Sequence, residues 1–325
     1  MIHTRDLART FTSGKEVVEA VKGIDLDVAE GELVAFLGPN GAGKSTTLRM
    51  LTSLLPPSSG SARVAGIDVV ADPAGVRQRI GYIGQKDGAG HSYRVVDELL
   101  MQGRFYGLSK GEAARRGRAL LASLDLEGME LRKVQTLSGG QKRRLDIALG
   151  LIHEPALLFL DEPSTGMDPQ NRANLWEHIL RLREERGTTI VMTTHYLEEA
   201  DQRAERVVVI DHGRIIADDT ADVLKAEQAG DRVHLAVGAP DVAAARSELA
   251  ALGSEVDERA DGPLVRLSAR VEHSVGVLPR VVRRLADVGV EVVEASAQQP
   301  TLDDVFLNLT GRSLREAVDT QQEAA

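Results

Sequence analysis

The sequence contains no cysteine, which excludes disulfide bonds, cysteine-ligated zinc and thiol catalysis and suits a reducing compartment. Long apolar runs are also missing: a stretch such as Ala156 to Leu160 is far shorter than the roughly 20 residues that a helix needs to cross a bilayer. The first residues, Met1 to Phe11, carry charged side chains and no apolar segment followed by a small-residue cleavage site. We therefore expect a cytoplasmic chain that does not span the membrane.

Basic residues are in the minority, with 39 Lys and Arg against 49 Asp and Glu and a net charge of −10. Such a chain repels nucleic acid and anionic lipid, so no nucleic acid is expected as a partner. The remaining composition is ordinary for a folded protein, with 42% hydrophobic and 27% charged residues. The length of 325 residues accommodates one large α/β domain and a smaller one.

Short β-rich apolar runs alternate with longer helical patterns in the first two thirds of the chain. They are apolar on both faces, as expected for buried strands of a largely parallel sheet. The runs are Leu33 to Leu37, Arg79 to Ile83, Ala156 to Leu160, Thr188 to Thr193 and Arg206 to Ile210. Between Val95 and Leu151 the spacing becomes helical, and we predict an inserted helical subdomain over residues 92–152.

The last third of the chain carries a different pattern, in which the predicted elements follow one another as β-α-β-β-α-β, the ferredoxin-like order. They span residues 232–237, 242–252, 254–259, 264–269, 275–288 and 290–297. We therefore predict a first domain over residues 1–228 and a small C-terminal α+β domain over residues 229–325. We expect the second domain to be an accessory or regulatory domain, and the alternative is a packing extension without a task of its own.

Residues 38–45 match the spacing G-x-x-x-x-G-K-[ST] and directly follow a predicted strand. Glycines let several N–H groups point at phosphate oxygens, and the helix N-terminus that follows adds the positive end of its dipole. We expect Lys44 to reach the β- and γ-phosphates of ATP and Ser45 to bind Mg²⁺. The alternative is a glycine-rich turn with a surface lysine. The predicted nucleotide-binding residues of this loop are Gly38, Pro39, Asn40, Gly41, Ala42, Gly43, Lys44, Ser45 and Thr46.

A second apolar strand ends in two adjacent acids, Asp161 and Glu162. A buried strand fixes its terminal residues rigidly, so Asp161 can hold Mg²⁺, directly or through water. Glu162 can then polarise the attacking water as a general base. Two acids at a strand end could instead cap the next element, but the phosphate-binding loop favours the catalytic interpretation.

One segment between these motifs, Leu137-Ser138-Gly139-Gly140-Gln141, matches the signature sequence of ATP-binding-cassette (ABC) ATPases. Its serine and glycine amides open a helix and would form a second anion cradle, although in isolation the segment could be a helix cap. The chain also resembles this family at Gln85 (the Q-loop glutamine), Ser164 to Asp168 (the D-loop) and His195 (the switch histidine). Phe11 could be the aromatic residue that stacks on adenine, and a core position is the alternative.

The resemblance covers roughly residues 1 to 220 and implies a P-loop NTPase cassette with a helical subdomain. It implies a head-to-tail homodimer that sandwiches ATP and Mg²⁺ between its subunits. The residues with implied catalytic roles are Lys44, Gln85, Glu162 and His195. The implied metal-binding residues are Ser45, Gln85 and Asp161. The residues implied to face the nucleotide of the partner subunit are Ser138, Gly139, Gly140, Gln141 and Asp168.

Three stretches resemble the daunorubicin-resistance group of ABC-2 type drug exporters: Gln141 to Ala148, Thr194 to Asp201 and Pro300 to Phe306. This resemblance implies a separate multi-span membrane permease, a position at the cytoplasmic face of the cell membrane, and efflux of a drug or secondary metabolite. An ABC importer is an alternative, because cassette motifs do not encode direction. Another is a soluble non-transport ABC ATPase that acts on ribosomes or DNA. A binding module without turnover is disfavoured by the intact Glu162 and His195.

Overall fold

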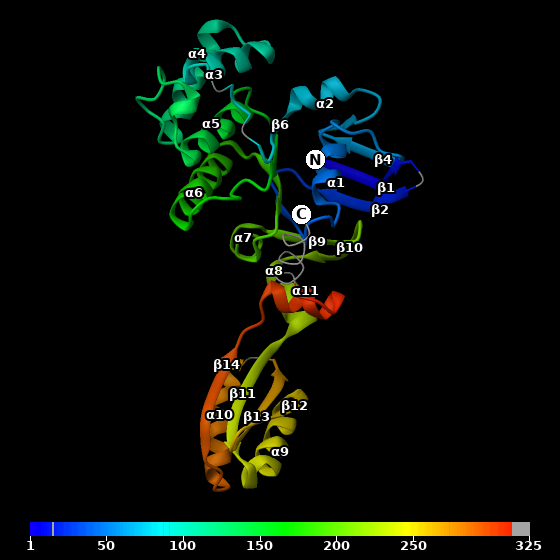
Figure 1. Ribbon diagram of the computed structural model, residues 1–325, viewed down its shortest axis with the longest axis vertical. Coiled ribbons are helices and arrows are strands. Elements are labelled where there is room, and N and C mark those ends of the chain that lie inside the picture. The colour runs from blue at the N-terminus through cyan, green and yellow to red at the C-terminus, as the bar shows by residue number, and fades with distance from the viewer. Residues whose placement is uncertain (15, 87, 91, 273, 314–325) are drawn as a thin grey trace. The chain divides into compact units, whose positions relative to one another are not determined.

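The computed structural model describes residues 1–14, 16–86, 88–90, 92–272 and 274–313. The chain divides into two compact units, Met1–Asp218 and Asp219–Ala325. Figure 1 shows both units with most of their elements labelled. Among the described residues, no helix combines the length and the apolar character that crossing a membrane requires.

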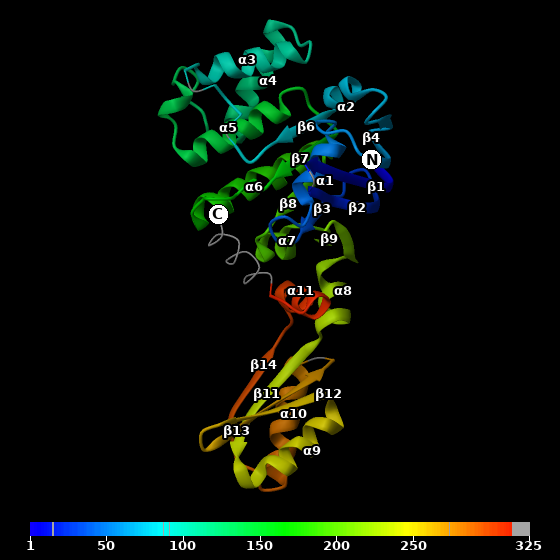
Figure 2. The same ribbon diagram turned by 45° about the vertical axis from the view of Figure 1, so that its right-hand side comes forward.

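The first unit is built on a six-stranded sheet in the order β10-β9-β3-β8-β7-β6. Figure 2 labels the strands β9, β3, β8, β7 and β6 of this sheet. Its strands are β3 (Leu33–Leu37), β6 (Ile80–Ile83), β7 (Leu157–Asp161), β8 (Thr189–Thr194), β9 (Arg206–Asp211) and β10 (Arg214–Asp219). The pairs β3–β8, β3–β9, β6–β7 and β7–β8 are parallel, and β3, β7 and β8 are buried along their whole length. The five predicted strands are thus confirmed. Because neighbouring strands are parallel, the carboxyl ends of β3, β7 and β8 meet at one edge of the sheet, the usual place for a ligand site.

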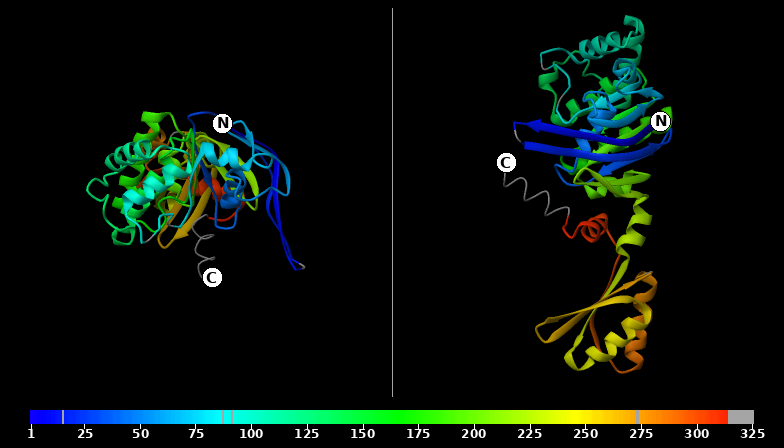
Figure 3. Two further views of the ribbon diagram at one scale, coloured as in Figure 1. Left: turned by 90° about the horizontal axis from the view of Figure 1, so that it is seen from above. Right: turned by 90° about the vertical axis from the view of Figure 1, so that its right-hand side faces the viewer.

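A second sheet, which the sequence pattern did not predict, contains four antiparallel strands in the order β2-β1-β4-β5. They are β1 (Ile2–Ser13), β2 (Glu16–Val28), β4 (Ser59–Val64) and β5 (Ile67–Asp68). Figure 3 shows β1 and β2, in dark blue, running side by side in both views. Val21, Ile24 and Leu26 of β2 are buried in one core with Phe36 of β3. These strands are buried on one face only, so they lack the continuous apolar runs that predict a strand buried on both faces.

The helices of the first unit begin with α1 (Lys44–Leu51), which follows β3, and α2 (Pro73–Arg79), which precedes β6. Helices α3 (Val95–Phe105), α4 (Lys110–Ser123) and α5 (Gly139–Leu151), with the 3₁₀ turn η1 (Val134–Thr136), occupy the predicted helical insertion. Figure 2 shows this group and the antiparallel sheet on opposite sides of the unit. The last two helices, α6 (Pro169–Arg186) and α7 (Leu197–Arg203), follow β7 and β8.

The second unit contains the predicted β-α-β-β-α-β series. Its elements are β11 (Asp231–Gly238), the 3₁₀ turn η3 (Ala239–Asp241), α9 (Val242–Leu252), β12 (Ser254–Asp261), β13 (Leu264–Val271), α10 (Ser274–Asp287) and β14 (Val292–Gln298). The sheet order is β12-β13-β11-β14 and every neighbouring pair is antiparallel, which confirms the ferredoxin-like arrangement. Helices α9 and α10 cover one face of this sheet (Figure 3, right), and their Leu249, Val281 and Leu285 are buried against Leu235 and Leu267.

The second unit begins earlier than the boundary predicted at residue 228. The polar stretch before that residue is not a linker: it forms α8 (Ala221–Leu224) and the π-helical turn η2 (Lys225–Ala229). Both pack against α11 (Leu302–Thr310), and the Asn308 side-chain amide donates a hydrogen bond to the Gln228 carbonyl at 2.8 Å. Residue 228 therefore lies inside the second unit, and the division falls between Asp218 and Asp219.

Candidate active site

The predicted phosphate-binding residues, 38–46, connect β3 to the first turn of α1. Gly43 is the N-cap of α1 with a φ of 105°, and a Cβ at this position would lie 2.5 Å from the Ala20 carbonyl oxygen. Only glycine fits both conditions. The first N–H groups of a helix have no partner inside the helix, so this loop can offer backbone donors to an anion.

The Lys44 side chain is buried beside this loop, with 4% of the residue exposed. Its Nζ donates hydrogen bonds to the carbonyl oxygens of Gly38, at 2.6 Å, and Pro39, at 2.9 Å. Burial lowers the pKa of Lys44 to about 8, and the charges of Glu162 and Asp161 oppose this shift. A phosphate group at the loop would add negative charge and favour the ammonium form, so the position of Lys44 fits an anionic ligand.

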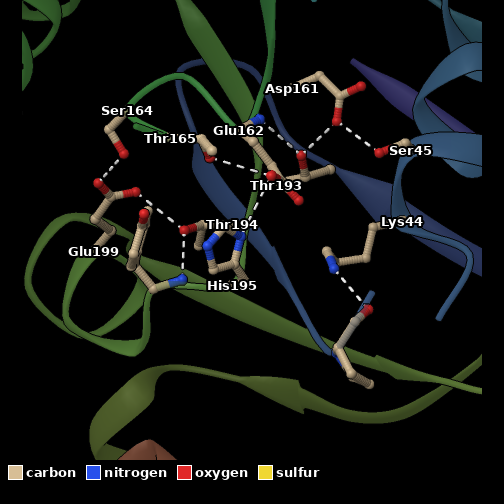
Figure 4. A network of polar contacts seen from close by, with 12 residues as sticks. Lys44, Ser45, Asp161, Glu162, Ser164, Thr165, Thr193, Thr194, His195 and Glu199 are labelled. Atoms are coloured by element: carbon tan, nitrogen blue, oxygen red, sulfur yellow. Dashed lines mark hydrogen bonds and ion pairs between the residues drawn. The ribbon is translucent and has the colours of Figure 1, made fainter. Parts of the chain in front are cut away.

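Asp161, at the end of β7, accepts hydrogen bonds from two hydroxyl groups (Figure 4). Its Oδ1 accepts hydrogen bonds from Ser45 Oγ at 2.8 Å and from Thr193 Oγ1 at 2.7 Å. Its Oδ2 is buried without a hydrogen-bond partner among the described residues. A hydroxyl beside a carboxylate with one unpaired oxygen suits Mg²⁺, which typically binds through one or two carboxylates together with substrate phosphates and water. Ser45 and Asp161 therefore fit the predicted metal site.

The part of the chain that the structure describes holds no cluster of three or more His, Cys, Asp or Glu side chains able to bind a metal. Gln85, also predicted as a metal ligand, is exposed and lines the hollow described below.

Glu162 follows Asp161 in an unusual backbone conformation, with a φ of 48°. Its N–H lies 3.0 Å from Thr193 Oγ1 and 3.2 Å from the Thr193 carbonyl oxygen, which hold the turn in place. The carboxylate oxygen Oε2 lies 3.3 Å from Nδ1 of His195 and accepts a hydrogen bond from Thr165 Oγ1 at 3.2 Å (Figure 4). Left-handed backbone costs energy at a non-glycine residue, so the two Thr193 contacts help to hold Glu162 in this conformation.

The charge state of Glu162 follows from its neighbours. Burial alone raises the pKa of the carboxyl, but contacts with His195, Lys44 and Thr165 outweigh it and lower the pKa below its usual value. Glu162 is therefore ionised at neutral pH and can accept a proton. With Lys44 and Asp161 beside it, the arrangement can orient a water molecule against a bound phosphate group.

A hollow of about 390 Å³ lies between the start of α5 and the turn after β7. It brings together residues from four of the predicted motifs: Q-loop, signature, acidic strand end and D-loop. Its lining residues are Gln85, Ser138, Gly139, Gly140, Arg143, Glu162, Thr165, Gly166, Met167, Asp168 and Asn171.

The signature segment opens α5 as a helix cap, which is the alternative weighed from the sequence. Ser138 Oγ accepts from the Gln141 N–H at 3.2 Å, and Gln141 Oε1 accepts from the Ser138 N–H at 3.0 Å. Ser138 and Gly139 are nevertheless exposed, and a Cβ at Gly139 would meet nothing within 4 Å. Internal packing does not require glycine there. The bare backbone is accessible to a ligand that approaches from outside the chain.

Two further predicted residues are exposed. Asp168 is the N-cap of α6, where it accepts hydrogen bonds from the backbone N–H of Asn171 at 2.9 Å and from its side-chain amide at 2.5 Å. Both hydrogen bonds lower the pKa of Asp168, and the bond from the Asn171 backbone N–H has the larger effect. Phe11 lies on β1 with 40% of its surface exposed, and the Arg9 guanidinium lies 4.7 Å from its ring centroid. Exposure excludes the core alternative for Phe11.

Arg143 lies within the stretch Gln141 to Ala148, but no sequence motif assigned it a role, whereas the structure places it beside the site. This side chain is buried and its Nε donates to the Pro163 carbonyl at 2.7 Å, while Nη1 donates to the Gly84 carbonyl at 2.6 Å. Nη2 lies 3.4 Å from the Glu162 carbonyl oxygen. One guanidinium on the signature helix thus holds the turn after β7 and the residue before Gln85. Only the fold brings these segments together, so no local pattern could reveal the role.

Comparison with known proteins gives the family. A family model described as ABC transporter matches residues 21–165. The daunorubicin resistance ATP-binding protein DrrA3 of Streptomyces coeruleorubidus is 44% identical over 302 residues, which cover 92% of this chain and 94% of that protein. The chain belongs to the ABC transporter family of ATP-binding proteins. It is an ABC ATPase, as the signature segment predicted.

Other ABC relatives match over similar lengths. The daunorubicin/doxorubicin resistance ATP-binding protein DrrA of Streptomyces peucetius is 40% identical over 99% of this chain and 98% of that protein. The Nod factor export ATP-binding protein I of Paraburkholderia xenovorans is 38% identical over 91% of this chain and 93% of that protein. Among solved structures, a dimeric ATP-binding cassette in a post-hydrolysis state with ADP and Pi matches with a TM-score of 0.63 and 26% identity, covering 68% of this chain and 98% of that chain.

Proposed function

We propose that this chain is the ATP-hydrolysing subunit of an ABC exporter and powers efflux of a drug or secondary metabolite through a separate multi-span permease. The observation that carries the proposal is the cluster in which Ser45, Thr193 and His195 surround the Asp161–Glu162 pair, beside the buried Lys44. These residues fit the requirements of phosphoryl transfer to water. The names of the relatives, which include daunorubicin resistance proteins and a Nod factor export protein, support export.

Within one subunit, Lys44 would bind the β- and γ-phosphates, and Ser45 and Asp161 would hold Mg²⁺. When bound, Mg²⁺ neutralises the charge that develops on the phosphate oxygens. Glu162 would accept the proton of the attacking water, because it is ionised and held at the end of a rigid strand. His195, at 3.3 Å from this carboxylate, would keep it oriented and contact the γ-phosphate.

The exposed start of the signature helix and the exposed Asp168 at the end of the D-loop support a second part of the proposal, a homodimer with two composite sites. Ser138, Gly139, Gly140 and Gln141 present a helix N-terminus to the outside, and Asp168 is exposed on the same hollow. These groups would complete the nucleotide site of a second copy, since each chain carries both halves. Phe11 would stack on adenine and Gln85 would complete the Mg²⁺ site. The dimeric cassette among the matched structures supports this arrangement.

The permease would dock on the helical insertion, where Tyr93, Met101 and Phe105 are exposed, Phe105 to 78%. Exposed apolar and aromatic side chains on α3 are typical of a protein interface. The chain would then lie at the cytoplasmic face of the cell membrane.

The experiment that tests this function is affinity purification of the tagged chain from detergent-solubilised membranes of its host, followed by mass spectrometry. Recovery of a polytopic membrane protein supports transport. Deletion of the chain should then increase cellular retention of the exported compound, and Lys44→Ala should fail to restore efflux. Loss of uptake on deletion would indicate an importer instead, and recovery of ribosomal or DNA-repair proteins alone would contradict transport.

A further inference from the structure

Glu199 is a buried carboxylate on α7 outside the catalytic motifs, and only 4% of the residue is exposed. Figure 4 shows that each of its two carboxylate oxygens accepts a hydrogen bond from a different hydroxyl group. Ser164 Oγ donates to Oε1, and Thr194 Oγ1 donates to Oε2 at 3.0 Å. Both hydroxyl residues are themselves 1% exposed. A buried carboxylate is costly unless it is paired, so the loss of either hydroxyl bond is unfavourable.

The two hydroxyl residues belong to different functional segments. Ser164 follows the Glu162 turn and opens the D-loop, which ends at Asp168, the cap of α6. Thr194 directly precedes His195 in the chain, and its Oγ1 also accepts the Tyr196 N–H at 2.9 Å. The Thr194 hydroxyl therefore shapes the backbone turn that presents His195 to Glu162.

Arg172 joins the same two segments from another side. Its Nε lies 3.8 Å from Glu199 Oε1, and its Nη2 donates to the Met167 carbonyl oxygen in the D-loop at 3.4 Å. Its Cζ lies 4.0 Å from the ring centroid of Tyr196, and that ring lies 4.2 Å from the ring of His195. Arg172, like Glu199, therefore contacts both the D-loop and the segment that follows His195.

We propose that Glu199 is a positioning residue that holds the D-loop and the switch-histidine segment in one fixed arrangement. Through Thr194 it sets the position of His195, which would act on the nucleotide of its own subunit. Through Ser164 it sets the D-loop, which would carry Asp168 to the nucleotide of the partner. A shift of either segment displaces the Glu199 carboxylate that both segments bind, so the D-loop and the switch-histidine segment move together.

A double-mutant cycle tests this coupling. Ser164→Ala and Thr194→Val each remove one hydroxyl bond to Glu199 and should each lower kcat for ATP on the order of 10-fold with little change in KM, because the groups are misplaced while the phosphate-binding loop is intact. If one carboxylate joins the two segments, the double variant should be about as slow as the slower single variant. Thr4→Val is the matched control: Thr4 is fully buried in the antiparallel sheet and donates to the Ile24 carbonyl at 2.9 Å, so kcat should not change.

Two replacements of Glu199 itself test whether its role depends on the length of the side chain or on its negative charge. Glu199→Gln keeps the length and can bond both hydroxyls, whereas Glu199→Asp keeps the charge but is too short to bridge them. The glutamine variant should retain clearly more turnover than the aspartate variant. An aspartate variant as active as glutamine, or losses in the Ser164 and Thr194 double variant that multiply to about 100-fold, would overturn the proposal. Thermal unfolding verifies that each variant is folded, and the hydroxyl cycle decides alone if the aspartate variant unfolds.

This inference rests on the proposed ATP hydrolysis at this site but not on export or a permease. Absence of turnover in the unsubstituted chain contradicts both proposals. Normal turnover in the unsubstituted chain with multiplicative losses in the double variant contradicts the role of Glu199 alone.

Discussion

The buried Lys44 predicts that nucleotide affinity depends on pH in a range where ordinary lysines do not titrate. Burial lowers its pKa from 10.5 to about 8, so the ammonium form falls from about 90% at pH 7 to about 10% at pH 9. Bound phosphate favours the ammonium, so binding above pH 8 must take up a proton. If bound ATP restores the ordinary pKa, the apparent Kd should rise about 30-fold between pH 7 and pH 9.5.

Isothermal titration calorimetry with Mg-ATP at several pH values measures this change, and repeating it in buffers of different ionisation enthalpy counts the protons taken up. Lys44→Arg is the control, because a guanidinium stays charged throughout this range and should give a flat profile at whatever affinity it retains. A Kd for the unsubstituted chain that stays constant from pH 7 to 9.5 would refute the reasoning.

The lowered pKa of Lys44 has the opposite effect on folding without nucleotide: raising the pH weakens nucleotide binding but stabilises the folded chain. Between pH 8 and pH 10.5 the unfolded chain keeps the Lys44 proton more tightly than the folded chain does. The contribution of Lys44 to the free energy of unfolding should therefore rise with pH across this window. Chemical denaturation of the chain and of Lys44→Met at pH 7.5 and pH 10 isolates this contribution.

Three further substitutions test other parts of the site. Glu162→Gln should bind ATP normally but lose turnover on the order of 10²–10⁴-fold, because an amide cannot accept the proton of water; a steady-state phosphate-release assay that shows normal turnover would exclude Glu162 as the base. Asp161→Asn should weaken the Mg²⁺ dependence of hydrolysis and lower turnover on the order of 100-fold, and an unchanged magnesium titration would place the metal elsewhere. Arg143→Lys should lower kcat on the order of 10-fold with KM for ATP little changed, because the single nitrogen of lysine cannot replace the two separate donors, Nε and Nη1, that bind the Pro163 and Gly84 carbonyls. Arg132→Lys, at an exposed arginine, is its control.

Sequence patterns predicted the buried parallel strands and the ferredoxin-like order of the tail because both depend on local periodicity. The strands β3, β7 and β8 are continuous apolar runs with burial on both faces. Strand β2 alternates buried and exposed positions only in its second half, so its sequence predicts a strand only weakly. The domain boundary was misplaced because α8 and η2 are short and polar, and they become part of the second unit only by packing against α11.

In the candidate site too, local sequence motifs identify some residues, and only the three-dimensional fold identifies the others. Motif spacing identified Lys44 and the Asp161–Glu162 pair, which the structure brings into one cluster. Thr193 lies in no motif, and the stretch Thr194 to Asp201 contains Glu199 without giving it a role, because both roles depend on which strands and helices lie side by side. Thr193 faces Asp161 only through the parallel register of β7 and β8, and the sequence does not specify that register.

The central claim, that two copies of this chain close around nucleotide, is tested most directly by the mass of the Glu162→Gln variant in solution. Multi-angle light scattering should show one chain without nucleotide and twice that mass with Mg-ATP, since the variant binds ATP without hydrolysing it. Adding Ser138→Arg should block the dimer while leaving ATP binding intact, because the bulky side chain occupies the exposed start of α5. A Glu162→Gln chain that binds Mg-ATP and still has the mass of one chain would contradict the account.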